Sequence, residues 1–286
     1  MANLKEIRNR ISSVSSTMQI TSAMKMVSAA KLKKAQDAIT AMRPYADKLT
    51  ELLQSLSATL DADSGSTFST QRDVKNVLIV PITSNRGLCG AFNSNIIKQT
   101  NYLIDNVYAG KNVSVVAIGK KTNDAFAKKD IVIANKSEVF DDLTFDNVSE
   151  IAQLLMDKFV AGDFDKIEVV YNKFKNAATQ EVITEQFLPI VQVEANANVN
   201  LDYIFEPTKV EIVEQLIPKS LKTQLYKAIR DSFASEHGAR MTAMHKATDN
   251  ATELRDQLKL TYNKARQAAI TNEILEIVGG AEALNN

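Results

Sequence analysis

Residues 4–60 read LKEIRNRISSVSSTMQITSAMKMVSAAKLKKAQDAITAMRPYADKLTELLQSLSATL. The stretch contains no glycine and one proline, Pro44, and its residues form two series with a spacing of seven. The first series is Leu4, Ile11, Met18, Lys25, Leu32, Ile39, Ala46, Leu53 and Leu60, and the second is Ile7, Val14, Thr21, Ser28, Ala35, Met42, Leu49 and Leu56. Apolar residues at such positions predict a long helix that packs against a second helix as a coiled coil.

The apolar pattern weakens in the middle of this stretch. The polar members of the two series are Thr21, Lys25 and Ser28, and the neighbouring apolar residues are Ile20, Met24 and Val27. We therefore expect the coiled-coil register to break there, with the apolar residues moved to a neighbouring stripe.

The second helix is expected near the other end of the chain. Residues 219–278 contain no proline and one glycine, Gly238, and as a helix they would extend for roughly 90 Å. The predicted seam comprises Met244, Ala247, Ala251, Leu254, Leu258, Thr261, Ala265 and Ala268. Since one compact domain cannot bury so long a helix, we expect the two terminal helices to pair as an antiparallel, left-handed coiled coil.

Between the helices the sequence alternates as in an α/β fold. Strands are predicted at 77–81, 113–118, 131–134, 166–174 and 181–193, and helices at 91–107, 120–128 and 145–160. This order predicts a mostly parallel sheet in a Rossmann-like domain inserted between the long helices. The expected divisions are an N-terminal helix at 1–60, a linker at 61–75, the α/β domain at 76–207 and a C-terminal helix at 208–286.

The composition limits the possible partners and compartments. The formal net charge is zero, which argues against nucleic acid as the main partner. The first helix is basic, however, and has no acidic residue between Glu6 and Asp37, so it is either a solvated face or a surface for an acidic protein. Cys89 is the only cysteine, which excludes an intramolecular disulfide and favours a reducing compartment. No apolar run approaches the ~20 residues of a membrane span.

The sequence offers no convincing catalytic site. It has no phosphate-binding loop, and the turn Gly87–Gly90 lacks the spacing of a dinucleotide-binding turn. His237 and His245 would lie about 12 Å apart along a helix, too far to bind one metal. We predict no catalytic residue, no cofactor and no metal, and therefore no enzyme acting alone.

Three segments carry a family resemblance: IRNRISSVSSTMQITSAMKMVSAAKLKKAQ at 7–36, ITSNRGLCGAFN at 82–93, and ASEHGARMTAMHKATDNATELRDQLKLTYNKARQAAITNEILEIVGGA at 234–281. They resemble the gamma subunits of F-type ATP synthases of the bacterial type, and the resemblance covers the whole chain. It implies a central rotor shaft, one copy per complex, that couples ion-driven rotation of the c-ring to successive conformational changes at the catalytic beta subunits. The implied partners are three alpha and three beta subunits, the epsilon subunit and the c-ring. Contact with the membrane would occur only through the complex, with the chain peripheral on the cytoplasmic face of the cell membrane.

The resemblance also implies roles for particular residues. Those implied to contact the lever loops of the beta subunits are Met24, Lys25, Val27, Arg240, Gln267 and Thr271. Those implied to form an apolar bearing at the tip of the second helix are Ile274, Leu275, Ile277 and Val278. Those implied to face the c-ring are Tyr203, Phe205 and Glu206.

Two other interpretations are consistent with parts of the pattern. A coiled-coil tether or adaptor with a non-catalytic α/β domain explains the heptads, but not the basic run or the inserted domain. A Rossmann-type enzyme with helical oligomerisation arms would need a phosphate-binding turn and a polar catalytic cluster, and the sequence shows neither.

Overall fold

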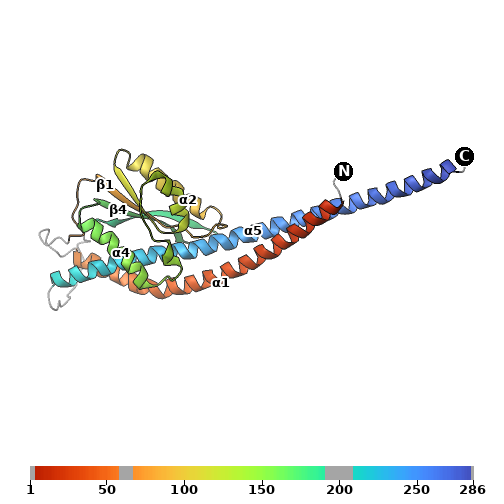
Figure 1. The fold of residues 1–286 in the computed structure, drawn as a ribbon. Coiled ribbons are helices and arrows are strands. Elements are labelled where there is room, and N and C mark those ends of the chain that lie inside the picture. Colours follow the sequence, from red (N-terminus) through yellow and green to blue (C-terminus); the bar gives the residue numbers. More distant parts are fainter. Residues whose placement is uncertain (1–3, 58–66, 191–208, 285–286) are drawn as a thin grey trace. The chain divides into compact units, whose positions relative to one another are not determined.

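The computed structural model describes residues 4–57, 67–190 and 209–284. The first and the last element along the chain are two long helices, α1 at Leu4–Ser57 and α5 at Lys209–Leu284 (Figure 1). Between them lie β1 (Asn76–Pro81), α2 (Phe92–Tyr102), the π-helical turn η2 (Leu103–Val107), β2 (Asn112–Ala117), α3 (Lys120–Phe126), η3 (Ala127–Lys129), β3 (Val132–Asn135), η4 (Ser137–Phe140), α4 (Phe145–Val160), β4 (Lys166–Phe174) and β5 (Gln180–Leu188). The predicted class, long terminal helices around an α/β sheet, is confirmed.

The five strands form one mixed sheet in the order β3-β2-β1-β4-β5. Strands β1 to β4 are parallel to their neighbours, and β5 runs antiparallel to β4. The prediction for β5 was too long: the strand ends at Leu188, whose pairing with Ile167 is the last of the ladder, and Pro189 follows. Proline has no backbone N–H and cannot continue a ladder as a donor.

Each face of the sheet is covered by helices because successive strand residues point to opposite sides. On one face, Leu78 and Val80 of β1 join α4 and the segment of α5 from Ile217 to Ile229 in a single apolar core. On the other face, Val77 and Ile79 pack with residues of α2 and η2. Figure 1 shows α4 and α2 on these opposite sides. Helix α5 is therefore part of the core of the α/β domain.

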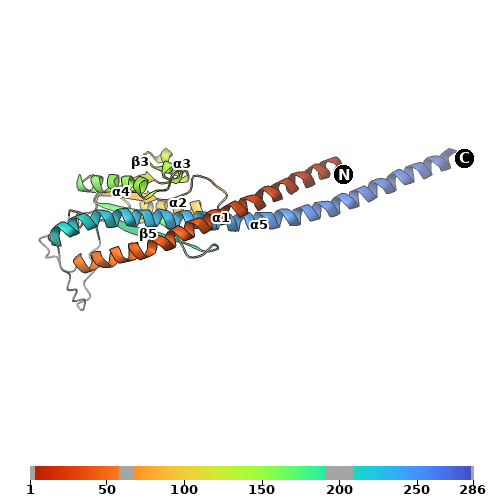
Figure 2. The same cartoon turned by 90° about the horizontal axis from the view of Figure 1, so that it is seen from below.

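The chain divides into two compact units. One runs from Ala29 to Arg240, and the other contains the part of α1 up to Ser28 and the part of α5 from Met241. Within the first unit, β5 lies along α5, as Figure 2 shows. Gln224 of α5 donates from Nε2 to the Glu185 carboxylate of that strand, over 2.8 Å.

Candidate interaction surface on the terminal helices

Several side-chain pairs join α1 to α5 in the unit that contains the N-terminus of α1, and three of them show how the helices run. Arg8 Nη2 donates to the Tyr262 hydroxyl over 3.1 Å. The hydroxyls of Thr21 and Thr248 lie 2.8 Å apart, and Lys25 Nζ lies 3.3 Å from His245 Nδ1. Residue numbers rise on α1 as they fall on α5, so the two helices are antiparallel here, as predicted.

The expected break in the register of α1 was wrong. Thr21 is 8% exposed and Ser28 is 3% exposed, so both lie in the buried stripe. The apolar neighbours Ile20 and Val27 are instead 61% and 58% exposed. The register continues because a threonine pair can satisfy its hydroxyls across the seam and with backbone carbonyls. The seam of α1 is therefore unbroken, and Ile20 and Val27 belong to an exposed apolar strip beside it.

Three of the eight predicted seam residues of α5 do not lie in the seam. Met244 and Ala251 are buried, and Ala247, Leu258 and Ala265 are partly buried, as expected for seam positions. Leu254, Thr261 and Ala268 are exposed, and the residues facing α1 are Thr248, Arg255 and Tyr262. Arg255 Nη1 lies 3.5 Å from the sulfur of Met18. Arginine and tyrosine fit a seam because each has an apolar stem and a polar end.

Helix α5 extends past the start of α1. Lys25 lies opposite His245 and Arg8 opposite Tyr262, so the same pairing places Leu4 opposite Arg266. Figures 1 and 2 both show α5 continuing beyond the N-terminal end of α1. The four predicted tip residues lie on this single-helix segment and are 55%, 62%, 72% and 52% exposed, in the order Ile274, Leu275, Ile277 and Val278.

The predicted contact residues do not form one cluster. Met24 and Lys25 are partly buried and Val27 is exposed, all on α1. Gln267 and Thr271 are exposed on the single-helix segment of α5, where the Thr271 hydroxyl donates to the Gln267 carbonyl over 2.9 Å. The three residues predicted to face the c-ring, Tyr203, Phe205 and Glu206, lie outside the described residues.

Arg240 differs from the other predicted contacts because it is only 7% exposed. Its guanidinium donates from Nη2 to the carbonyls of Arg86 and Gly87, over 3.1 and 3.2 Å, and from Nε to Gly87 over 3.3 Å. Nη1 pairs with the Glu236 carboxylate at 2.6 Å and lies 3.4 Å from His237 Nδ1. Arg240 thus joins α5 to the turn that follows β1. Glu236 was not among the predicted site residues, although its spacing of four residues from Arg240 is typical of helical ion pairs.

The burial of this cluster shifts its protonation equilibria. Burial raises the pKa of Glu236, and the charge and hydrogen bond of Arg240 act in the opposite direction. Burial, together with the positive charges of Arg240 and Lys31, lowers the pKa of His237 to about 4. Burial also raises the pKa of the thiol of Cys89, which lies in the turn. The cluster therefore contains a neutral histidine, a protonated thiol and one compensated ion pair.

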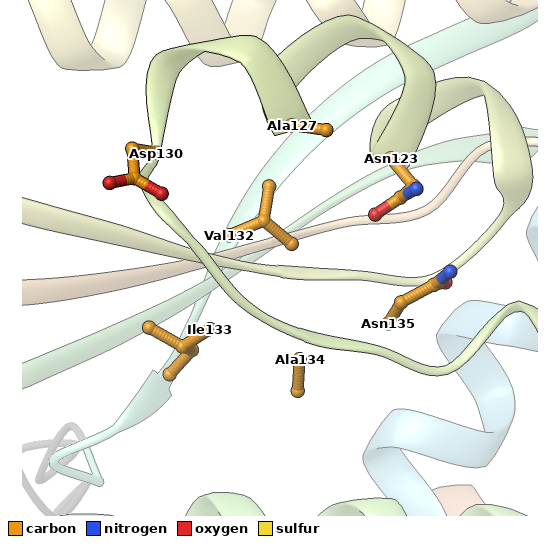
Figure 3. Close-up of a pocket in the computed structure, with 7 residues that line it drawn as sticks. All are labelled: Asn123, Ala127, Asp130, Val132, Ile133, Ala134 and Asn135. Atoms are coloured by element: carbon orange, nitrogen blue, oxygen red, sulfur yellow. The ribbon is translucent and has the colours of Figure 1, made fainter.

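The α/β domain also has a shallow pocket beside the edge strand β3. Its volume is about 280 Å³, and its lining residues are Asn123, Ala127, Asp130, Val132, Ile133, Ala134 and Asn135 (Figure 3). Asp130 is the one titratable residue among them. Within residues 4–57, 67–190 and 209–284, no group of three or more His, Cys, Asp or Glu side chains is arranged to hold a metal ion. Over the same ranges, no helix combines the length and apolarity needed to cross a membrane.

Comparison with known proteins identifies the family. A family model described as ATP synthase matches residues 3–284. The ATP synthase gamma chain of Flavobacterium psychrophilum is 77% identical over 285 residues, which is 99% of each chain, and that of Flavobacterium johnsoniae is 73% identical over 286 residues, the whole of each chain. The gamma chain of Geobacter sp. is still 44% identical over 287 residues, again 99% of each chain.

Solved structures share the fold. A chain in the mitochondrial ATP synthase of Euglena gracilis, in rotational state 3, superimposes with a TM-score of 0.69 at 22% identity, covering 98% of this chain and 94% of that one. A chain of the rotor from the same organism, in rotational state 1, gives 0.66 at 22% identity, with 93% and 98% covered. This chain belongs to the ATP synthase gamma chain family.

Proposed function

We propose that this chain is the central rotor shaft of an ATP synthase, coupling ion-driven rotation of the c-ring to sequential changes at the catalytic beta subunits. The observation that carries the proposal, beside the family, is the uncovered apolar end of α5 beyond α1. Large exposed apolar side chains on a segment without a partner helix are typical of a surface that another protein covers. The proposed assembly has one copy of this chain among three alpha and three beta subunits, with the epsilon subunit and the c-ring, peripheral on the cytoplasmic face.

The proposed contact surface contains Met24, Lys25 and Val27 on α1, and Gln267 and Thr271 on α5. A shaft can change the nucleotide affinity of a surrounding subunit only when its contacts with that subunit differ between its orientations. The difference in contact free energy between orientations then becomes a difference in nucleotide affinity. Lys25 supplies positive charge, and Val27 supplies an apolar side chain that is 58% exposed. Arg240 is not placed on this surface, because its guanidinium donors are held within its own chain.

For the tip we propose a bearing in an apolar collar of the hexamer. Apolar contacts are non-directional, whereas hydrogen bonds depend strongly on angle and would resist turning. We therefore expect Ile277→Asn to slow turnover of the assembled complex by roughly threefold, less than 1 kcal/mol of activation free energy.

Two observations within the α/β domain support a non-catalytic role. In open α/β sheets of this strand order, ligands bind outside the carboxyl ends of the strands where the order reverses, here between β1 and β4. At that edge, Arg240 of α5 binds the turn after β1, and the Ser235 hydroxyl donates to the Asn172 carbonyl of β4 over 2.9 Å. We propose that α5 takes the place of a nucleotide and that the chain has no catalytic site of its own.

The test is reconstitution with purified alpha and beta subunits and measurement of ATP hydrolysis with and without this chain. We expect turnover to appear or rise sharply at one copy per hexamer. We expect Lys25→Glu to reduce that turnover by about tenfold, because charge reversal at an interface introduces like-charge repulsion. Lys111→Glu makes the same charge change in the α/β domain and is the matched control.

The alternatives predict different results. An adaptor would join the hexamer without changing turnover, and an enzyme would bind nucleotide as the isolated chain. Unchanged turnover at saturating chain would contradict the rotor.

A further inference from the structure

The turn from Ser84 to Gly90 meets α5 at a directional contact. Two backbone carbonyls, those of Arg86 and Gly87, point to one guanidinium, and the opposite side of that guanidinium is paired with Glu236 of the same helix. Arg240 is also the last residue of the Ala29–Arg240 unit. The contact therefore lies where α5 leaves the α/β domain.

We infer that Arg240 is a positioning residue that fixes the rotation and height of the Ile217–Arg240 segment of α5 relative to the sheet, so that torque passes from the α/β domain into this segment. The inference rests on the proposed function, because only a shaft must pass torque from its α/β domain into the helix. It gives Arg240 an intramolecular role in coupling, distinct from a contact with another subunit.

The other contacts between α5 and the domain are mostly apolar, and the hydrogen bonds that Gln224, Arg230 and Ser235 donate to the domain do not join one planar group to two adjacent carbonyls. The α5 residues in the apolar core are Ile217, Leu221, Leu225, Ala228 and Ile229. Burial of these side chains holds the helix against the sheet, but the hydrophobic effect has no preferred direction. A guanidinium that donates to two adjacent carbonyls is directional, since such bonds weaken steeply when the angle departs from linear. Arg240 thus adds resistance to sliding and turning that the apolar contacts lack.

The turn itself is built to hold its carbonyls in place. The Ser84 hydroxyl donates to the Arg86 carbonyl over 2.6 Å, and the Ser84 N–H donates to the Asn93 side-chain oxygen over 2.9 Å. Leu88 adopts a left-handed conformation, with φ of 62°. Non-glycine residues hold this conformation only where the surrounding structure imposes it. Because the turn is rigid, the hydrogen bonds that Arg240 donates to it also hold α5 to the C-terminal end of β1.

Arginine is required for this geometry. Lysine keeps the charge, but its single ammonium cannot reproduce the planar fork that reaches two carbonyls and a carboxylate together. Arg240→Lys therefore removes the orientation while retaining the charge beside Glu236. Arg230 provides a matched control, because it lies on the same helix and donates from Nη2 to a carbonyl of another loop, that of Leu143, over 2.7 Å.

The experiment uses the complete complex in vesicles and measures ATP hydrolysis together with ion translocation, followed by a potential-sensitive dye. For Arg240→Lys we expect hydrolysis within about twofold of wild type but the charge moved per ATP to fall by roughly threefold or more, because the α/β domain and α5 slip against each other. Arg230→Lys should keep the wild-type ratio. A general loss of stability would lower both rates together and leave the ratio unchanged.

Cys89 reports on the turn directly. It is the only cysteine in the chain and is 1% exposed, next to the carbonyls that Arg240 binds. Modification of this thiol in Arg240→Lys should be about tenfold faster, which corresponds to about 1.4 kcal/mol of easier local opening. In Arg230→Lys it should remain at the wild-type rate.

Each result of these experiments supports or overturns either the inference on Arg240 or the proposed function. An unchanged ratio of ion transport to hydrolysis in Arg240→Lys would overturn the inference and leave the rotor assignment intact. If the wild-type chain fails to support turnover, the proposed function itself fails. If Arg240→Lys does not assemble, Glu236→Gln, which keeps the side-chain length, replaces it: a lowered ratio supports the inference and a wild-type ratio overturns it.

Discussion

Helix α5 is continuous from Lys209 to Leu284, but its two halves have different surroundings. In the segment from Ile217 to Arg240, most side chains are covered by the sheet, α4 and the turn after β1. From Leu254 to Val278 the same helix has seven large apolar side chains that are 46% to 72% exposed. One half is stabilised by its own chain, and the other retains apolar area for a partner. A continuous helix can therefore belong to a core at one end and to an interface at the other.

Truncating one leucine in each half gives the largest expected difference. Leu225 is 0% exposed in the core, so Leu225→Ala should lower the free energy of unfolding by about 2–5 kcal/mol, through lost burial and the cavity left behind. Leu275 is 62% exposed, and Leu275→Ala should change it by less than about 0.5 kcal/mol. Urea denaturation of the isolated chain measures both. Equal destabilisation by the two variants would refute the proposed contrast.

His237, in the half of α5 that packs against the sheet, should contribute to the pH dependence of the free energy of unfolding. Its pKa is about 4 in the folded chain against an ordinary value of 6.5, so between these values the unfolded chain binds a proton that the folded chain does not. Stability is therefore fully present above pH 6.5 and falls as the pH drops towards 4. The urea midpoint measured at intervals across this window should fall less in His237→Gln than in wild type.

Carboxyl groups titrate in the lower part of the same window, so only the difference between the two proteins is informative. His245→Gln, on the exposed side of α5, is the matched control and should keep the wild-type slope. A slope that is the same in wild type and His237→Gln would show that His237 is not held neutral by the fold.

Two of the three glycines of α5, Gly238 and Gly279, extend the comparison to the smallest expected effect. A Cβ at Gly238 would lie 3.2 Å from backbone atoms of Ala177 in the β4–β5 hairpin, whereas one at Gly279 would meet nothing within 4 Å. Gly238→Ala should destabilise by about 1 kcal/mol, because overpacking outweighs the gain in helix propensity. Gly279→Ala should increase helicity without a penalty. Circular dichroism during thermal unfolding distinguishes the two, and a stabilised Gly238→Ala would mean that the hairpin gives way.

Much of the fold could be predicted from the sequence, because the spacing of apolar residues indicates where helices and strands form and which of their faces is buried. Short stretches rich in β-branched and aromatic residues identified β1, β2 and β4 to within a residue, and the seven-residue spacing identified the buried stripe of α1. The antiparallel pairing was also predictable, because two long helices at opposite chain ends must bury their stripes against each other.

The errors on the two long helices share one physical cause, since the prediction assigned burial there mainly from apolarity. Leu254 was preferred to Arg255 as a seam residue, and Thr21 was taken for a break, yet long or hydroxylated side chains occupy the seam by satisfying their polar atoms there. The burial of Arg240 was equally invisible. It depends on two backbone carbonyls more than 150 positions away, and no local pattern encodes them.

The long sequence separation of the helix pair also has a consequence for biosynthesis. Arg8 and Tyr262 are 254 positions apart, and Thr21 and Thr248 are 227 apart. At a translation rate of about 5–20 residues per second, α1 leaves the ribosome roughly 10–50 s before its partner is complete. All five strands are made in that interval, and until α5 follows, the stripe of α1 has no partner and one sheet face has only α4 to cover it. Nascent chains that end before α5 should therefore be ready substrates for chaperones, and synthesis of the last helix closes the core and the seam together.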